Sequence, residues 1–369
     1  MSGTIRVLVV DDSALMRKLL PQMLQRDKTI EVVGTAMDGA FGMKKIEEVQ
    51  PHVITLDLEM PRMDGTEMLR QIMRTQKIPV IIVSSHSIAG AAATFKALAL
   101  GAFDFVAKPR DGAPERIEEI ASELISKIKV AAKARAGRWP TMIPVNGTPK
   151  PLTKPAVRTT SSASRIIAIG SSTGGPNTLQ YLLSQLPGDF PAAMAVVQHM
   201  PEGFTEMFAR RLDEGCALEV KEAQSGDLLT AGRVLICPGS RHMRVKRMPQ
   251  GDIAVLSDEP PVNGHRPSVD LLFRSVAREF GARAIGILMT GMGDDGADAL
   301  GEIRNAGGFT IAQSEESCVV FGMPKAAIDK GFVTRVVPLE SMANTLQVHC
   351  SVPGAAPAHN ESGAQKESR

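Results

Sequence analysis

The feature that most constrains the fold of this chain is an alternation of short apolar runs with amphipathic stretches. In the first 127 residues, five apolar runs are each followed by a helix-like stretch, the runs being "IRVLVV", "IEVVGTA", "HVITLD", "VIIVSS" and "FDFVAKP". Parallel strands need crossover connections, which helices supply while covering both faces of the sheet. The alternation therefore predicts a five-stranded doubly wound α/β domain. Pro21, within the first amphipathic stretch, predicts a kink or an early end of that helix.

The same alternation returns after residue 164, where the strand-like runs are "RIIAIG", "AMAVVQHM", "AIGILMTGMGDDG" and "FTIAQ". Residues 216–258 interrupt it with several short strand-like runs and with turn signals at "PGS" and "PQGD". The second domain is therefore predicted to be a doubly wound α/β domain with an antiparallel β insertion. A length of 369 residues suffices for two such domains.

A basic segment separates the two alternations. Residues 124–188 contain nine Lys and Arg residues and no Asp or Glu, whereas the whole chain has a formal net charge of +2. Much of this segment is rich in Pro, Ser and Thr and lacks helical periodicity, which favours a solvated linker over a nucleic-acid-binding segment. We therefore expect a first domain at 1–127, a flexible basic linker at 128–163, a second domain at 164–350 and a disordered polar tail at 351–369.

Composition argues against a membrane protein. No apolar run reaches the about 20 residues of a membrane-spanning helix, and the first residues lack the basic flank and cleavage site of a secretory leader. The four cysteines lie far apart and form no C-x-x-C pair, so we expect them to be reduced and mostly buried: Cys216, Cys237, Cys318 and Cys350. The protein is expected to be soluble and cytoplasmic.

Polar and charged side chains stand at the ends of the strands in the first predicted sheet. Asp11 and Asp12 follow the first strand, Asp57 ends the third, Ser84 closes the fourth and Lys108 ends the fifth. The carboxyl ends of parallel strands share one edge of a sheet, so these side chains should converge. Three carboxylates raise one another's pKa unless a cation neutralises them, and an all-oxygen cluster suits Mg²⁺. Helix capping could account for Asp12, but not for Asp57 and Lys108 together.

These residues, in this order, resemble the receiver domain of two-component response regulators over about residues 4–127. The resemblance implies that Asp57 accepts a phosphoryl group from a histidine kinase, and that Asp11 and Asp12 hold Mg²⁺ together with Asp57. It also implies that Lys108 and Ser84 contact the phosphoryl group and link it to a conformational change. Ser84 stands where many members of that family have threonine, which preserves the hydroxyl group.

The second domain begins with a strand, a tight turn and a helix, in the stretch "RIIAIGSSTGGPNTLQYLL". Ser172 lies at the centre of a G-x-S-x-G sequence within it. Such a turn exposes a serine hydroxyl above the sheet and leaves N–H groups at the start of the helix for an oxyanion. A glycine-rich phosphate cradle is the alternative. It is disfavoured because G-x-G-x-x-G is absent and His199, rather than an acidic residue, ends the next strand.

His199 and a pair of aspartates supply the other residue types of a serine hydrolase. His199 ends the strand after Ser172, and Asp294 and Asp295 follow a later strand, so all of them lie on the carboxyl edge of the sheet. A serine hydroxyl needs an imidazole to take its proton, and the imidazole needs a carboxylate to fix its tautomer. On these grounds alone, either aspartate fits the third place.

Five motifs of this domain resemble the catalytic domain of the chemotaxis protein-glutamate methylesterase and glutamine deamidase family, the CheB family, over about residues 164–349. The motifs are "GSSTGGP", "VVQHMPEGF", "GHRPSVDLLF", "LMTGMGDDGA" and "FGMPKAA". That family also places a receiver and a linker before this domain. The resemblance implies Ser172 as nucleophile, His199 as general base and Asp295 as the orienting carboxylate. It implies that the N–H group of Met292 helps to stabilise the oxyanion, and we expect the N–H group of Thr173 to do so as well.

Neighbouring candidates are weaker. His265, in "GHRPSVD", lies in a loop that should border the site, but no strand aims it at Ser172. Ser171 adjoins Ser172 without being the centre of G-x-S-x-G, and only the family resemblance prefers Asp295 to Asp294. Three further histidines are expected to be structural or to lie on the surface: His52, His86 and His242.

Together, the two resemblances imply a phosphorylation-activated serine hydrolase that demethylates glutamate methyl esters and deamidates glutamines on the cytoplasmic domains of chemoreceptors. A chemotaxis-type histidine kinase would be the phosphodonor, Mg²⁺ would serve receiver phosphorylation, and the esterase reaction would need no cofactor. We expect a monomer that neither binds nucleic acid nor inserts into a membrane. The alternatives are a DNA-binding output domain and a module that has lost catalysis. Both are disfavoured, because residues 164–349 offer no basic reading helix and keep all three triad residue types.

Overall fold

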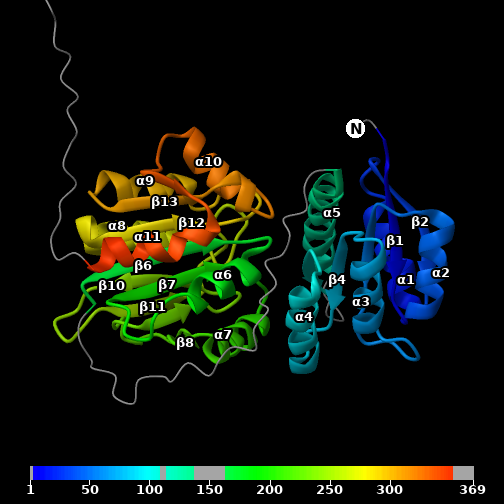
Figure 1. Cartoon of the computed structure of the whole chain (residues 1–369), viewed down its shortest axis with the longest axis horizontal. Helices are drawn as coiled ribbons and strands as arrows, with labels where there is room; N and C mark the ends of the chain where they lie inside the picture. Colours follow the sequence, from blue (N-terminus) through cyan, green and yellow to red (C-terminus); the bar gives the residue numbers. More distant parts are fainter. Residues whose placement is uncertain (1–2, 109–113, 137–162, 352–369) are drawn as a thin grey trace, which may run out of the picture.

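The strands of the N-terminal sheet are apolar along most of their length because both faces of the sheet are covered. Val7, Leu8, Val9 and Val10 of the first strand expose at most 1% of their surface. The computed structural model (Figure 1) describes residues 3–108, 114–136 and 163–351. In it, five parallel strands form a sheet in the order β2-β1-β3-β4-β5. They are β1 (Ile5–Val10), β2 (Ile30–Ala36), β3 (Val53–Leu56), β4 (Val80–Ser84) and β5 (Asp104–Ala107).

Helices fill the connections between these strands, and side-chain caps begin four of them. The helices are α1 (Ala14–Leu24), α2 (Gly39–Val49), α3 (Gly65–Thr75), α4 (Ile88–Leu100) and α5 (Pro114–Ala136). Ser13, Asp38, Asp64 and Ser87 each accept a hydrogen bond from a backbone N–H group in the first turn of α1 to α4, respectively. Pro21 lies inside α1, which continues past it to Leu24. The predicted five-stranded doubly wound domain is confirmed.

The last helix of this domain extends beyond the predicted domain boundary at residue 127. α5 continues to Ala136, and Ile128 and Ala131 are fully buried in the N-terminal core. The first residues of the expected linker therefore belong to a helix that the domain core holds in place. Ala163, the last residue of the expected linker, is buried in the core of the C-terminal domain. Residues 137–162 of the expected linker and 352–369 of the expected tail lie outside the residues that the structure describes.

A second parallel sheet, of seven strands, organises the C-terminal domain. Its order is β14-β13-β12-β6-β7-β9-β8, and all its paired strands run parallel. The strands are β6 (Arg165–Ser171), β7 (Ala192–Gln198), β8 (Glu219–Glu222), β9 (Arg233–Ile236), β12 (Ala284–Leu288), β13 (Phe309–Gln313) and β14 (Arg335–Val337). The helices are α6 (Gly175–Ser184), α7 (Phe204–Gly215), α8 (Val269–Phe280), α9 (Ala297–Asn305), α10 (Met323–Asp329) and α11 (Leu339–Ser351). The predicted α/β class of this domain is confirmed.

The antiparallel insertion is smaller than the sequence indicated. Within residues 216–258, the two strands that pair antiparallel are β10 (His242–Lys246) and β11 (Ile253–Ser257). β8 and β9 instead extend the parallel sheet beside β7, because the apolar residues Val234, Leu235 and Ile236 are fully buried there. For these two strands the prediction was wrong, since their short length alone does not reveal which neighbour they pair with.

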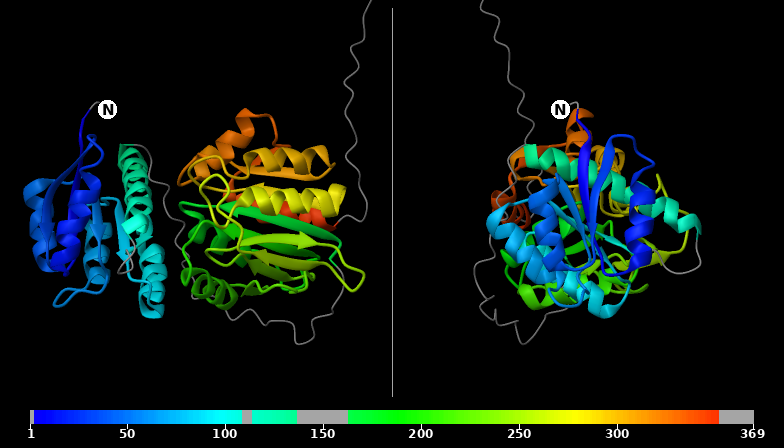
Figure 2. Two further views of the ribbon diagram at one scale, coloured as in Figure 1. Left: turned by 180° about the vertical axis from the view of Figure 1, so that it is seen from behind. Right: turned by 90° about the vertical axis from the view of Figure 1, so that its right-hand side faces the viewer.

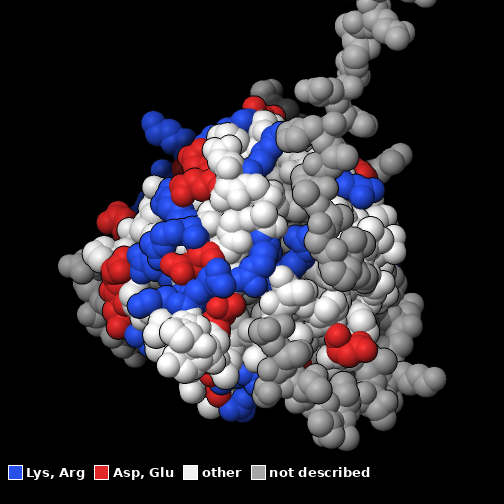
Figure 3. Space-filling model, turned by 90° about the vertical axis from the view of Figure 1, so that its left-hand side faces the viewer, with Lys and Arg blue, Asp and Glu red and all other residues white. Residues whose placement is uncertain are grey.

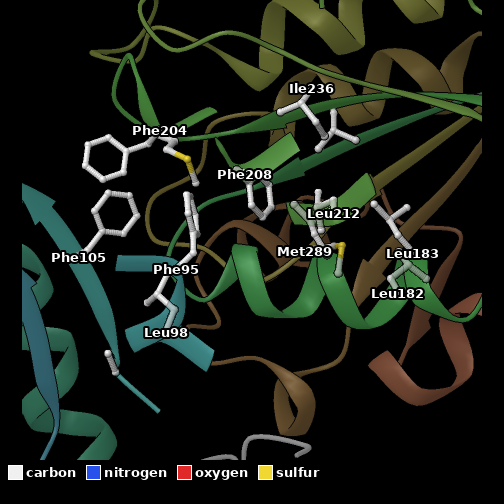
Figure 4. Close-up of a cluster of buried hydrophobic side chains, with 14 of the residues drawn as sticks. Phe95, Leu98, Phe105, Leu182, Leu183, Phe204, Phe208, Leu212, Ile236 and Met289 are labelled. Carbon is white, nitrogen blue, oxygen red and sulfur yellow. The ribbon is translucent and has the colours of Figure 1, made fainter. Parts of the chain in front are cut away.

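Helices α4 and α5 lie between the N-terminal sheet and the C-terminal domain, as Figure 1 and Figure 2 both show. α4 packs against α6 and α7, and Figure 4 shows the aromatic residues at this contact. The rings of Phe105 and Phe204 stack with their centroids 4.8 Å apart, and those of Phe95 and Phe208 with their centroids 5.5 Å apart. Each of these four residues exposes at most 3% of its surface. One apolar core therefore continues from one domain into the other.

A loop of the C-terminal domain makes a second contact with the N-terminal domain. Val319 and Val320, between β13 and α10, pack against the N-terminal core cluster to which Leu124 and Ile128 of α5 belong. This loop, residues 314–322, also borders the turn after β6, because a Cβ atom built on Gly174 would lie 2.6 Å from the Cβ atom of Val319. The two domains therefore touch close to the carboxyl edge of the second sheet.

The end of the molecule remote from the N-terminal domain carries charges of both signs. Figure 3 shows Lys and Arg side chains forming a band there, with Asp and Glu side chains between them. Ion pairs of the C-terminal domain include Arg274 with Glu302, at 2.9 Å, and Arg244 with Glu259, at 2.6 Å.

Two expectations from composition can be compared with the described part of the chain. All four cysteines are buried and none is in a disulfide within the described residues, as predicted. Among the helices within residues 3–108, 114–136 and 163–351, none has the length and apolar character needed to cross a bilayer.

Candidate active site

The turn after β6 places two adjacent serines in opposite environments. Ser171 is fully buried and its hydroxyl donates a hydrogen bond to Oε1 of Gln198 at 2.7 Å, whereas Ser172 is half-buried. The amide of Gln198 also donates to the carbonyl of Ser172 at 2.9 Å. A Cβ atom on Gly175 would lie 1.9 Å from Oε1 of Gln198, so this close contact requires glycine. The turn thus leaves Ser172 as the hydroxyl that can reach a substrate.

His199 stands beside Ser172 because β6 and β7 are neighbouring parallel strands. Ser171 pairs with Gln198 in the strand register, and the N–H group of His199 donates to the carbonyl of Ser171 at 3.0 Å. The ring of His199 bonds through Nε2 to Oδ2 of Asp295 at 2.8 Å. Its Nδ1 atom is buried and has no hydrogen-bond partner among the described residues. Since a carboxylate only accepts, Nε2 carries the proton and Nδ1 is the nitrogen that can take one.

Asp295 is the carboxylate that meets His199, and its neighbour Asp294 is exposed. Asp295 exposes 1% of its surface. Burial would raise the pKa of Asp295, but the hydrogen bond and charge of His199 and the N–H groups of Val269 and Asp270 lower it to about 2. Asp295 is therefore an anion at neutral pH, as a partner of an imidazolium must be.

The N-terminus of α8 holds Asp295, which the sequence analysis missed. Oδ1 of Asp295 accepts from the Ser268 hydroxyl at 2.9 Å and from the Asp270 N–H group at 3.1 Å. Oδ2 accepts from the Val269 N–H group at 2.7 Å, in addition to His199. Free N–H groups and the helix dipole make a helix N-terminus a site for an anion. The signal in the sequence was "SVD" at the start of an apolar helix pattern, but the anion it binds lies 26 residues away from Val269.

The two N–H groups expected to stabilise an oxyanion lie on loops that touch each other. A Cβ atom on Gly291 would lie 2.9 Å from Cβ of Ser172, so the loop carrying Met292 packs against the serine. The Ser172 N–H group is already engaged by the Thr290 carbonyl at 3.0 Å, and the Thr290 hydroxyl donates to the Thr173 carbonyl at 2.9 Å. Within the described residues, the N–H groups of Thr173 and Met292 have no such acceptor.

Asp11, Asp12, Asp57 and Lys108 meet at the carboxyl edge of the N-terminal sheet. The Lys108 ammonium lies 2.7 Å from Oδ2 of Asp57 and 3.0 Å from Oδ2 of Asp11, and oxygens of the three carboxylates lie within 4.8 Å of one another. Burial raises the pKa of Asp11, and the charge of Asp57 raises it further against the opposing effect of Lys108. Burial would lower the pKa of Lys108, but the hydrogen bond and charge of Asp57, together with Asp11, raise it.

Ser84 lies at the end of β4, and its hydroxyl bonds to α4 rather than to this cluster. Its hydroxyl donates to the carbonyl of Gly90 in the first turn of α4 at 3.1 Å. The structure therefore brings together the acidic residues and Lys108, and shows Ser84 bound to the helix that contacts the C-terminal domain.

The remaining histidines occupy distinct environments. His265 stacks on the ring of His199, with their centroids 4.2 Å apart. His52 accepts from the Arg6 N–H group at 3.2 Å, and His242 is fully buried with its Nε2 atom 3.1 Å from the Pro260 carbonyl. His86 contacts Phe204 edge-on at the domain interface, with ring centroids 6.2 Å apart.

Comparisons with known proteins define the class of this molecule as a response regulator with an enzymatic output domain. Residues 7–121 match the family model "Response regulator receiver domain", and residues 167–346 match "CheB methylesterase". The chain is 63% identical over 349 residues to "Protein-glutamate methylesterase/protein-glutamine glutaminase 2" of Koribacter versatilis (strain Ellin345), covering 93% of this chain and 96% of that protein. It is 47% identical over 352 residues to the protein of the same name of Hahella chejuensis (strain KCTC 2396), covering 92% and 95%.

A solved structure agrees with these matches. The catalytic domain of the CheB methylesterase of Thermotoga maritima is 39% identical, with a TM-score of 0.50, and covers 51% of this chain and 100% of that one. The chain therefore belongs to the protein-glutamate methylesterase/protein-glutamine glutaminase family. The resemblance seen in the sequence motifs is confirmed, including the predicted class of enzyme and the receiver domain that precedes it.

Proposed function

We propose that this protein hydrolyses the γ-methyl esters of glutamate residues on the cytoplasmic domains of chemoreceptors, and deamidates glutamines there. Both reactions pass through the same tetrahedral intermediate on a side-chain carbonyl carbon. The products are a glutamate side chain with methanol from the ester, or with ammonia from the amide. Membership of the family and the hydrogen bond between His199 and Asp295, close to the turn that carries Ser172, support this proposal.

The proposed mechanism uses Nδ1 of His199, the ring nitrogen that has no hydrogen-bond partner among the described residues. Nδ1 of His199 takes the proton of Ser172 as its oxygen attacks the ester carbon, and Asp295 stabilises the imidazolium through Nε2. The N–H groups of Thr173 and Met292 hold the oxyanion. His199 then gives the proton to the departing methoxide oxygen, and water repeats the sequence on the serine ester. The observation that carries this mechanism is the hydrogen bond of 2.8 Å between His199 and the buried Asp295.

A direct test uses receptors carrying a labelled methyl group. Full-length protein activated with a small phosphodonor should release labelled methanol, and labelled serine-reactive phosphonate should modify Ser172. Phosphonate labelling without methanol release would show that the hydrolase is active on a different substrate. Absence of both would contradict the assignment of Ser172.

We further propose that Asp57 receives a phosphoryl group from a chemotaxis-type histidine kinase. Asp11, Asp12 and Asp57 fit Mg²⁺, because they offer hard oxygen donors close together and because burial and like charge disfavour the anion of Asp11. Mg²⁺, when bound, neutralises the carboxylates and the oxygens of the incoming phosphoryl group. Lys108 would contact the phosphoryl oxygens, and the Ser84 hydroxyl would leave Gly90 to do the same.

Phosphorylation should therefore depend on the metal. Incubation with acetyl phosphate and Mg²⁺ is expected to label Asp57, and chelation should abolish the labelling, because three carboxylates repel an anionic donor. Phosphate incorporation by mass spectrometry measures both results. Labelling that survives chelation, or that persists in Asp57→Asn, would contradict this assignment.

The contact between the domains supports control of the active site by the receiver. Asn177, in the first turn after the serine loop, donates to the carbonyl of Leu98 at 3.1 Å, and Phe204, at the start of the helix after His199, is buried by Phe105. A tethered domain is present at high effective concentration, so even a weak interface can restrict access for a large substrate such as a receptor. In the proposed switch, phosphorylation of Asp57 weakens this interface through Ser84 and α4.

Removing the receiver should accordingly release activity. A fragment beginning near residue 161 is expected to turn over methylated receptor faster than the unphosphorylated full-length protein, because nothing then covers the loops after β6 and β7. Phosphodonor should raise the rate of the full-length protein and leave that of the fragment unchanged. Steady-state methanol release measures both. Equal rates for fragment and unphosphorylated protein would rule out inhibition by the receiver.

A further inference from the structure

We propose that His265 is a positioning residue for the reaction, holding the plane of the His199 ring by stacking against it. The inference rests on the proposed function in one respect, that His199 acts as the general base. It assigns a role to a histidine that lies on no strand of the sheet and whose part in the chemistry was not evident from its loop position.

The contact between the two rings is close and nearly parallel. Their centroids lie 4.2 Å apart and their planes differ by 15°. Asp295 restrains the His199 ring at a single atom, Nε2, and this one hydrogen bond still allows small rotations of the ring about its Cβ–Cγ bond. A second ring lying flat on its face removes this freedom, so that Nδ1 keeps one direction. Proton transfer depends on that direction, because the serine oxygen must lie in line with the nitrogen lone pair.

A tight turn delivers His265 to this place. Val262 and His265 exchange backbone hydrogen bonds of 3.0 and 2.9 Å across Asn263 and Gly264, which have φ angles of 50° and 78°. Two central residues with positive φ form the two-residue turn that Asn-Gly favours. The amide of Asn263 also donates to Oδ2 of Asp270 at 3.4 Å, on the helix whose N-terminus holds Asp295. The loop carrying His265 and the carboxylate that orients His199 are therefore tied to the same helix.

The other side of the loop is held as well. The guanidinium group of Arg266 donates to the carbonyls of Asp258 and Glu259, at 3.3 and 3.2 Å. The backbone bonds to Val262 on one side of His265 and the guanidinium contacts of Arg266 on the other thus limit where the His265 ring can lie. Such a held ring can serve as a fixed surface for a neighbour, which a mobile loop side chain could not do.

A shared metal ion is the main alternative for this group, since His199, His265 and Asp295 offer donor atoms within 4.8 Å of one another. Two features oppose it. Both oxygens of Asp295 already accept two hydrogen bonds each. The lone pairs of imidazole nitrogens lie in the ring planes, and two nearly parallel stacked rings cannot both point them at one ion.

The charge state of His265 suits a stacking partner. Burial, and next the charge of His199, lower the pKa of His265. His265 therefore stays neutral while His199 accepts the serine proton, and it presents the face of a neutral aromatic ring to the imidazolium. A second protonated imidazole at this distance would instead oppose the step.

The test uses full-length protein activated with acetyl phosphate and three variants, His265→Ala, His265→Phe and His265→Gln. If stacking positions His199, His265→Ala should lower kcat on the order of 10- to 100-fold with little change in KM, the size of effect that a misplaced catalytic group causes. His265→Phe keeps a flat ring and should recover most of kcat, whereas His265→Gln keeps hydrogen-bonding groups and should not. Thermal unfolding of each variant shows whether the fold is intact.

The rate at which a fluorophosphonate labels Ser172 gives a second readout that needs no receptor. The labelling rate should follow the same order as kcat. Labelling should be fast in the wild type and in His265→Phe, and slow in His265→Ala and His265→Gln. If the wild-type protein is labelled at Ser172 but does not turn over the receptor, the proposed substrate is contradicted. The order of labelling rates among the variants then still tests the role of His265. Labelling of His265→Ala at the wild-type rate would overturn the inference. So would recovery in His265→Gln but not in His265→Phe, because it would make a hydrogen-bonding side chain, rather than the ring face, the functional group.

Discussion

Replacing Ser172 with alanine should lower the rate of methyl ester hydrolysis by about 10³-fold or more, since no hydroxyl then remains to form the acyl-enzyme. Ser172 is the half-buried serine of its turn, and its neighbour Ser171 is already bonded to Gln198. Release of labelled methanol from methylated receptor by phosphodonor-activated protein measures the loss.

Two comparisons make this result specific. Ser171→Ala removes a hydroxyl from the same turn and should retain most activity, at the expense of some stability from the lost buried hydrogen bond. The double variant of Ser172→Ala with His199→Ala should be about as slow as Ser172→Ala alone, because the two residues act as one unit. Near-wild-type turnover by Ser172→Ala would rule out the serine mechanism.

Replacing Asp295 with asparagine should cost on the order of 10³- to 10⁴-fold in kcat. The amide is neutral and cannot stabilise the imidazolium. In the wild-type protein each carboxylate oxygen of Asp295 accepts hydrogen bonds from two donors. The NH₂ group of the asparagine therefore faces two donors whichever oxygen it replaces. One outcome is that His199 reverses its tautomer to accept from the amide, which places a proton on the nitrogen that should receive one.

Asp294→Asn is the matched control, since it makes the same chemical change one residue away at an exposed position. Its kcat should stay within about threefold of wild type, in line with the small effects of surface substitutions. Asp295→Asn should also lower the midpoint of thermal unfolding, because buried donors lose their partner. Equal losses in the two variants would show that the carboxylate facing His199 has been misassigned.

Much of the fold follows from the sequence because parallel strands leave a strong pattern. The inner strands of these two sheets, such as β3 and β7, are buried on both faces and appear as continuous apolar runs, and each crossover needs an amphipathic helix. The pattern fails where strands are short. β8 has the sequence "EVKE", with one buried position, and nothing in it distinguishes the edge of a parallel sheet from one arm of a hairpin.

The positions of the candidate site residues also follow from topology, because Ser172 and His199 come directly after strands that end on one edge, and Asp295 lies in the loop that follows a third strand at that edge. The choice between neighbours does not. Ser171 and Ser172, or Asp294 and Asp295, differ in which side chain is buried, and that depends on partners such as Gln198 and the N-terminus of α8. These partners are distant in sequence, and the motifs in which they lie do not show which of two adjacent residues they contact. The aromatic contacts between the domains were equally hidden, since Phe95 and Phe204 look like ordinary core residues of separate domains.

The loop at Val319 and Val320 has a consequence for genetic dissection of the switch. The carbonyl of Val320 accepts from the Gly291 N–H group at 3.0 Å, so this loop holds the backbone beside Met292 while its side chains face the receiver core. We therefore expect a substitution at Val319 or Val320 to change both the proposed control by the receiver and the chemistry, so that one variant cannot distinguish the two effects. Phe95 is therefore the better target in a screen for constitutively active variants. Its ring packs against Phe204 and Phe208 of α7, which follow β7 and do not belong to the loop that carries Met292.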